Sequence, residues 1–316
     1  MSHRLAGPMA REIQEFLAFK RSLGYGYVRS EFTLRAFGRF LAHEARQMCL
    51  KDAVLAFLHR PAARPPRKPV SLATEFAPIR QFCLYLRRRD PRAFVPDRAW
   101  TRHPPSTFTP HVFSLAEIRL MLRRAARPRG PSCRSRCPGP LLRILILTLY
   151  CTGIRFGEAV RLRITDLQGG AFPVESKGRA RWVPFHPSLG REFERYLRWR
   201  RARQPSDGSA LLFVDSHGQQ LTVRYVSDAI RRLLREAGLK APSGRRGPRP
   251  YDLRHTYACH RLSQWYRAGV DVQSRLAWLS AYMGHTNVCG TEKYLHGTAD
   301  LLGMASRRFH QRFVRR

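Results

Sequence analysis

The chemistry of this chain is concentrated in residues 250–296, which begin Pro250-Tyr251-Asp252-Leu253-Arg254-His255-Thr256-Tyr257 and continue after a long helical passage through Met283-Gly284-His285 to Tyr294-Leu295-His296. It offers an arginine, a histidine and a tyrosine, with no cluster of metal-ligand residues. A guanidinium binds phosphate oxygens in a forked geometry, and a tyrosine can serve as a covalent nucleophile. This combination suits attack on a phosphodiester without a metal ion.

The chain is strongly basic, with 58 Lys and Arg against 22 Asp and Glu and a net charge of +36 over 316 residues. Such an excess repels itself and favours a polyanionic partner. Nearly all of these basic residues are arginine, which indicates either phosphate binding or a coding bias. The seven scattered cysteines without a signal peptide, and an apolar run at 141–154 too short to cross a bilayer, predict a soluble cytoplasmic protein.

The first part of the chain predicts a small basic helical bundle. Periodic apolar residues place helices at about 9–23, 30–46, 51–59 and 72–89, with Ser71 as the N-cap of the last. A segment rich in Pro and Arg at 90–112 forms a linker. The bundle is either a grip for nucleic acid or simply a four-helix domain.

The second part predicts a mainly helical domain with one small antiparallel sheet. Ser114 begins a capping box, an apolar helix at 141–152 follows, and 171–185 alternates like a hairpin. Arg155 lies just after the glycine that ends the apolar helix, and Lys177 lies at the hairpin turn. Each has a plain alternative, a structural pair with Glu158 for Arg155 and a solvated loop charge for Lys177.

Four elements in order, Thr-Gly-x-Arg-x-x-Glu at 152–158, the lysine hairpin at 177, Asp-Leu-Arg-His-Thr at 252–256 and Met-Gly-His…Tyr at 283–294, resemble the tyrosine recombinase (phage integrase-type) family. The resemblance covers residues 112–310 and extends more loosely to the N-terminal bundle, which is similar to the SAM-like core-binding domain of that family. It implies a DNA-binding core domain at 1–103 and an α+β catalytic domain at 104–316.

The resemblance also implies a role for each matching residue. Tyr294 would attack the scissile phosphorus and form a 3′-phosphotyrosyl bond, so no cofactor would be needed. Arg155 and Arg254 would clamp the non-bridging oxygens, and His285 would hydrogen-bond the same phosphate. Lys177 would be the general acid that protonates the leaving 5′ hydroxyl.

One position departs from the family pattern. Tyr251 stands where the family usually has histidine, and a phenol with a pKa of about 10 accepts protons poorly at neutral pH. His255 follows Arg254 directly, and because successive helical residues diverge by about 100°, we expect that it does not substitute. Tyr251 is therefore a modified base position that can still hydrogen-bond the phosphate.

The passage from Arg254 to His285 is longer than in compact members of the family, with the extra material forming an extended helix pair at 262–280. This pattern is similar to the branch associated with transposons and genomic islands. The tail at 301–316 has helical spacing, and it either docks into a neighbouring subunit or packs on its own domain.

The resemblance thus implies a site-specific DNA recombinase of a mobile element, acting on double-stranded recombination sites through a four-way junction. We expect a homo-tetramer on DNA or an assembly with related recombinases, located in the cytoplasm and on the nucleoid, with no membrane partner. Two alternatives are a catalytically weakened DNA-binding accessory protein and a type IB topoisomerase-like DNA relaxase.

Overall fold

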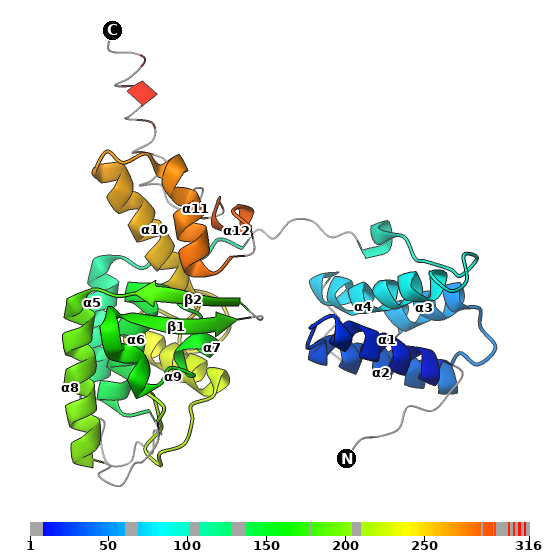
Figure 1. Ribbon diagram of the computed structural model, residues 1–316, viewed down its shortest axis with the longest axis horizontal. Helices are drawn as coiled ribbons and strands as arrows, with labels where there is room; N and C mark the ends of the chain where they lie inside the picture. Colours follow the sequence, from blue (N-terminus) through cyan, green and yellow to red (C-terminus); the bar gives the residue numbers. More distant parts are fainter. Residues whose placement is uncertain are drawn as a thin grey trace. The chain divides into compact units, whose positions relative to one another are not determined.

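The computed structural model describes residues 9–60, 69–101, 108–127, 137–176, 179–203, 210–285, 287–292 and 294, together with residues 303, 306, 309, 310 and 313. The chain divides into two compact units, Met1–Thr107 and Phe108–Arg316 (Figure 1). The division falls inside the segment at 90–112 that is rich in Pro and Arg. No helix within the described ranges is long and apolar enough to span a membrane.

The first unit contains the four predicted helices. They are α1 (Ala10–Ser22), α2 (Val28–His43), α3 (Leu50–His59) and α4 (Pro69–Arg87), followed by a short 3-10 turn, η1 (Arg98–Thr101). Their apolar faces share one core, which includes Ile13, Phe16, Leu34, Phe37, Val54, Phe57, Ile79 and Phe82. The periodicity of these residues is what made the helices predictable.

One helix start was predicted wrongly. α4 begins at Pro69, so Ser71 lies inside the first turn and does not cap the helix. A proline is favourable in the first turn because its φ is already helical and its missing N–H has no partner to lose there. The helix therefore begins earlier than the serine signal indicates.

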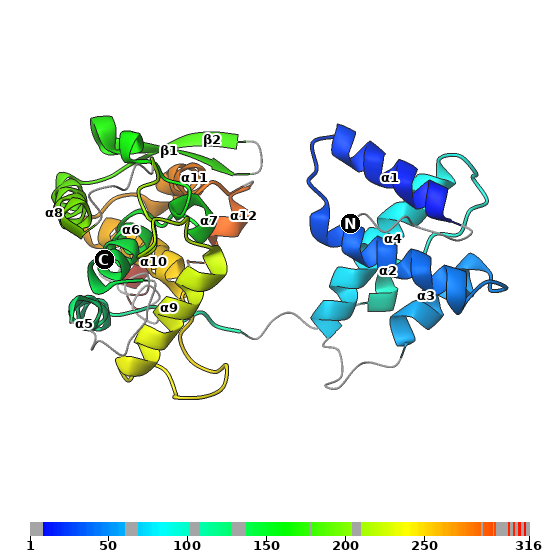
Figure 2. The same cartoon turned by 90° about the horizontal axis from the view of Figure 1, so that it is seen from below.

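The second unit is built around α6 (Gly139–Thr152), which is almost wholly apolar. Figure 2 shows this helix among its neighbours, α5 (Leu115–Ala126), α8 (Pro187–Arg203), α9 (Val223–Glu236) and α10 (Asp252–Arg267). The predicted capping box at the start of α5 is present, with Glu117 N–H donating to the Ser114 hydroxyl at 3.2 Å and Ser114 N–H donating to the Glu117 carboxylate at 2.7 Å. Because most of α6 is buried among these neighbours, its sequence shows no polar face.

The predicted hairpin is also present. β1 (Ala171–Ser176) pairs antiparallel with β2 (Arg179–Pro184), in a register that joins Ala171 to Pro184 and Ser176 to Arg179. Phe172, Val174 and Val183 are buried, in keeping with the alternation of the sequence. Lys177, at the turn of this hairpin, lies outside the described residues. Another 3-10 segment, η2 (Ile164–Gly170), precedes β1.

The long passage before His285 forms the predicted helix pair. It consists of α10 and α11 (Val272–Met283), and the Asp271 side chain caps α11 by accepting from Gln273 N–H at 3.0 Å. The two helices share a small core of their own that includes Ala258, Leu262, Leu276 and Leu279. Two four-residue helices complete the description, α7 (Phe156–Ala159) and α12 (Cys289–Glu292). Of the predicted helical tail, the structure describes residues 303, 306, 309, 310 and 313 alone, and the predicted docking of the tail lies outside the described residues.

Candidate active site

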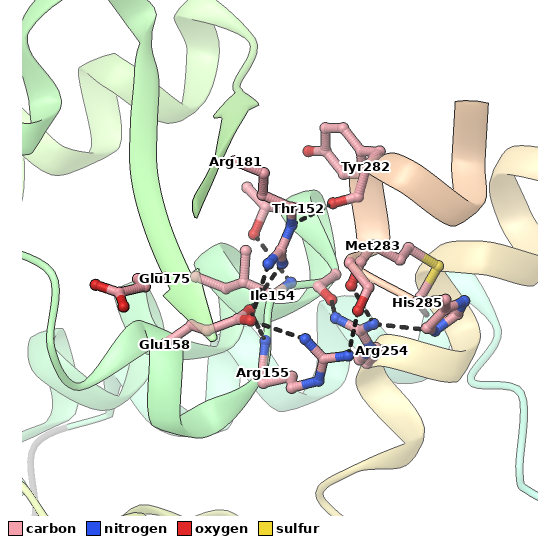
Figure 3. Close-up of polar contacts among 12 residues, drawn as sticks. Thr152, Ile154, Arg155, Glu158, Glu175, Arg181, Arg254, Tyr282, Met283 and His285 are labelled. Atoms are coloured by element: carbon pink, nitrogen blue, oxygen red, sulfur yellow. Dashed lines mark hydrogen bonds and ion pairs between the residues drawn. The ribbon is translucent and has the colours of Figure 1, made fainter. Parts of the chain in front are cut away.

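Arg155 lies two residues after Gly153, the glycine at which α6 ends and the chain changes direction. α6 ends at Gly153, which has a φ of +61°, and a Cβ added there would lie 2.4 Å from the Tyr257 ring, so a glycine is required. The chain then turns, and Arg155 becomes the N-cap of α7. Its guanidinium donates to the Glu158 carboxylate at 2.9 Å and to the Gly284 carbonyl at 2.7 Å (Figure 3). The Arg155 side chain is 29% exposed, so part of it faces solvent.

Glu158 is shared by two arginines. Arg181, on β2, donates to both carboxylate oxygens of Glu158 at 3.0 and 2.9 Å, and its Nε donates to the Tyr282 carbonyl at 2.7 Å (Figure 3). Burial alone would raise the pKa of Glu158, but the hydrogen bonds from Arg181 and Arg155 outweigh it and hold the pKa below its ordinary value. The ion pair between Arg155 and Glu158 that the sequence suggested is thus present, and Arg181 is a second partner of the same carboxylate.

Arg181 is a site residue that sequence reasoning missed. It lies on the strand that follows the lysine turn, two residues after Arg179. Its position in the sequence does not distinguish it from the many arginines expected on the surface. The hairpin register pairs Arg181 with Val174, and side chains of paired residues lie on the same face of the sheet. Because Val174 is apolar, this pairing could have indicated that the charge of Arg181 faces inward.

Arg254 is almost completely buried, at 2% exposure, near the start of α10. Its guanidinium donates to the carbonyls of Gly153 and Met283 and contacts His285 Nε2 at 3.1 Å. Burial lowers the pKa of the group, and the nearby Arg155 contributes in the same direction. Its Nε has no hydrogen-bond partner within the described part of the chain. The guanidinium of Arg254 therefore hydrogen-bonds to the carboxyl ends of both α6 and α11.

His285 follows the left-handed Gly284 that ends α11, at a φ of +65°. A Cβ at Gly284 would lie 2.6 Å from Arg181, which explains the glycine. The second ring nitrogen of His285, Nδ1, lies 2.7 Å from the Thr291 hydroxyl. Burial, and then the charges of Arg254, Arg155 and Arg181, lower the pKa of His285 to about 4, so the ring is neutral near pH 7.

Tyr294, two residues after the end of α12, lies beside His285 and Arg254. Its ring lies between two histidines, with centroids 4.8 Å from His255 and 6.0 Å from His285. The residue is 8% exposed, and burial raises the pKa of its phenol while the charge of Arg254 opposes that shift. The net direction of the pKa is upward, so the phenol is protonated at neutral pH.

The remaining predicted residues are placed differently. Tyr251 is 54% exposed at the start of α10, yet its phenol is close enough to influence the pKa values of Arg254 and Tyr294. The His255 ring contacts the Tyr294 ring, and its buried Nε2 has no hydrogen-bond partner among the described residues. The structure thus brings together Arg155, Arg254, His285 and Tyr294 and leaves Lys177 undescribed.

Residues 132–300 match the model of the phage integrase family. The chain belongs to this family, the tyrosine recombinases. A protein of Sinorhizobium fredii, y4rE, provisionally named an integrase/recombinase, is 33% identical over 95% of both chains. Members of the family break and rejoin DNA, and this chain is a recombinase of that kind.

Two solved structures share the fold of the recombinase. One is the Tn1549 transposon integrase in complex with transposon right end DNA, with a TM-score of 0.64, 16% identity and coverage of 96% of this chain and 99% of that one. The other is a lambda integrase tetramer bound to a Holliday junction, with a TM-score of 0.62, 16% identity and coverage of 90% and 75%. At these identities the likeness concerns the fold. Within the described ranges, the recombinase has no group of three or more His, Cys, Asp or Glu that could hold a metal ion.

Proposed function

We propose that this protein is a site-specific DNA recombinase that cleaves and rejoins DNA through a 3′-phosphotyrosine intermediate and exchanges strands through a four-way junction. The observation that carries the proposal is the convergence of Arg155, Arg254, His285 and Tyr294 from separate segments of the chain. A phosphodiester placed against these groups meets two guanidinium ions, an imidazole and a phenol. Those are the groups that an in-line attack on phosphorus requires.

In the proposed reaction, the Tyr294 hydroxyl loses its proton to solvent as its oxygen attacks phosphorus, and the bond from phosphorus to the 5′ oxygen breaks. The phosphate is then joined to Tyr294 at the 3′ end, and the leaving oxygen takes a proton, for which Lys177 is the proposed donor. A 5′ hydroxyl from another strand reverses the steps and releases the tyrosine. The bond energy is retained throughout, so the cycle is balanced without a cofactor.

Two arginines supply the charge that the transition state needs. Arg155 and Arg254 are held at carbonyl groups near each other, Arg155 at Gly284 and Arg254 at Met283. Both can exchange these neutral acceptors for phosphate oxygens, which are stronger partners for a guanidinium. We therefore propose metal-independent cleavage, with Tyr251 as a hydrogen-bonding group at the edge of the phosphate.

The two units divide the work in this proposal. Residues 1–103 form the core-binding domain that grips double-stranded DNA at the recombination sites, and residues 104–316 form the catalytic domain. The tetrameric lambda integrase complex supports a homo-tetramer on DNA or an assembly with related recombinases. The Tn1549 integrase complex supports a role in a mobile element such as a transposon. The protein would act in the cytoplasm, at the nucleoid.

The nucleophile can be tested on a suicide DNA duplex that carries the inverted repeats flanking the gene. We expect the wild-type protein to form a covalent protein–DNA adduct and Tyr294→Phe to form none while binding the duplex equally well. An adduct with the Phe variant would show that another residue is the nucleophile. Binding without any adduct from the wild type would favour an accessory protein, and relaxation of supercoiled DNA without a specific site would favour a topoisomerase.

A further inference from the structure

The hydrogen bonds around His285 fix where its proton lies. The guanidinium of Arg254 approaches Nε2 at 3.1 Å, and a guanidinium can only donate, so Nε2 must be an acceptor without a proton. The proton of the neutral ring is therefore on Nδ1, which donates to the Thr291 hydroxyl at 2.7 Å. In the free protein, Thr291 accepts and Arg254 donates.

The surroundings of His285 favour this neutral form. Positive charges face it from three elements, Arg254 on α10, Arg155 at the start of α7 and Arg181 on β2. The phenol of Tyr294 stacks on its ring. Thr291 is 0% exposed and belongs to α12, three residues before Tyr294, so the same short segment carries both the nucleophile and the partner of His285.

The arrangement of the free protein cannot persist with a phosphate in place. Phosphate oxygens of a diester only accept hydrogen bonds, and so does His285 Nε2 as it stands. A phosphate that takes the Arg254 donors would face a lone pair on Nε2. His285 can hold the phosphate only after a proton has moved to Nε2.

We propose that Thr291 is a positioning residue that reverses the hydrogen-bond polarity of His285 when a phosphate binds. One proton leaves Nδ1 and one arrives at Nε2 through solvent, so the charge of the ring does not change. The Thr291 hydroxyl then rotates and donates to Nδ1, while Nε2–H donates to the phosphate. A hydroxyl can serve in both states because it donates and accepts. This inference rests on the proposed function of the site.

The first test follows the protonation of His285 by nitrogen-15 NMR of labelled histidines in Tyr294→Phe, with the signals assigned by loss in His285→Gln. Dimethyl phosphate is the probe, since it is a diester anion with no proton to give. We expect Nδ1 protonated and Nε2 unprotonated in the free protein, and the opposite at saturating probe. An unchanged pattern, or protonation of both nitrogens, would overturn the inference.

The same titration separates this inference from the proposed function. Binding of the probe is read from broadening of its phosphorus-31 resonance, which Arg155→Ala should abolish. If no binding occurs in the parent protein, the phosphate site itself is wrong. If the probe binds and His285 keeps its tautomer, the role of Thr291 alone is wrong.

The second test removes the hydroxyl with little change in shape. We expect Thr291→Val to lower the single-turnover rate of adduct formation by roughly tenfold, as for one lost hydrogen bond, with unchanged DNA affinity, and Thr291→Ser to restore most of it. Thr148→Val is the matched control, because Thr148 is equally buried and its hydroxyl bonds the Ile144 carbonyl of its own helix. Equal rate losses in Thr291→Val and Thr148→Val, or no rescue by serine, would contradict a positioning role.

Discussion

Tyr251 and His255 both lie near Tyr294, the proposed nucleophile, and they differ in exposure. The phenol at 251 is largely exposed, whereas the imidazole at 255 is buried against the Tyr294 ring, and its Nε2 has no hydrogen-bond partner in the part of the chain that the structure describes. The residue placed where the family has a histidine is thus at the edge of the site. If Tyr294 is the nucleophile as proposed, we expect a substitution at this position to change the rate at which its proton is removed.

Restoring the histidine should accelerate cleavage. An imidazole with an ordinary pKa of about 6.5 accepts protons near pH 7 far better than a phenol, so Tyr251→His should raise the single-turnover adduct rate on the order of tenfold at pH 7. Tyr251→Phe is the matched control and should not accelerate it. Equal rates for the histidine and phenylalanine variants would mean that position 251 takes no part in proton transfer.

The lowered pKa of His285 makes folding sensitive to acid. Its folded value of about 4 lies below the ordinary 6.5, so the stabilising contribution is complete above pH 6.5 and is lost as pH falls towards 4. After allowance for solvent screening, this is worth about 2 kcal/mol. Urea unfolding of wild type and His285→Gln from pH 4 to 7 should show a shallower acid loss in the variant. Parallel pH curves would refute this assignment.

At the scale of elements, the helices and the hairpin could be predicted because each repeats a simple pattern of apolar residues. Four of the proposed site residues were also predictable, since their motifs are ordered along the chain. Arg181 was not, because its role depends on which strand face meets the end of α11. The start of α4 was wrong for a local reason, a proline that begins the helix before the serine signal. The contact between His255 and the Tyr294 ring could not be predicted either, because the position of Tyr294 is set by tertiary packing.

The hairpin should be stabilised by its inward arginine. Arg181→Met would leave the buried Glu158 with one ion-pair partner and the Tyr282 carbonyl without its donor, at a cost of about 3 kcal/mol in the free energy of unfolding. Arg195→Met is the control, because its pair with Glu192 is 69% exposed on the arginine side and should be worth less than about 1 kcal/mol. Chemical denaturation compares the two. Similar losses would mean that the Glu158 pair adds no special stability.

At the scale of the whole molecule, the net charge of +36 is carried by two units that each have apolar cores of their own, one cluster in the first unit and two in the second. Basic residues occur in both units, so both are suited to a polyanion. Under the proposed function, we expect one unit to hold the duplex and the other to carry the reactive site.

Binding to DNA should therefore weaken steeply with salt. If about six phosphates are contacted, the logarithm of the association constant should fall with the logarithm of salt with a slope of about −5. Fluorescence anisotropy with a labelled duplex over a salt series measures this slope. Tyr294→Phe is the control and should give the same value, because it changes no charge. A slope near −1 would indicate that few phosphates are neutralised.

Glu158 joins three segments that are distant in sequence, the start of α7, the second hairpin strand and, through Arg181, the end of α11. Its carboxylate side chain is 1% exposed, so losing a partner leaves a charge that water cannot reach. A protein in which only residue 158 or only residue 181 has been replaced would be less stable than one that keeps both. Descendants of this protein that replace one of the two are therefore expected to have replaced the other, and the pair should be inherited or lost together.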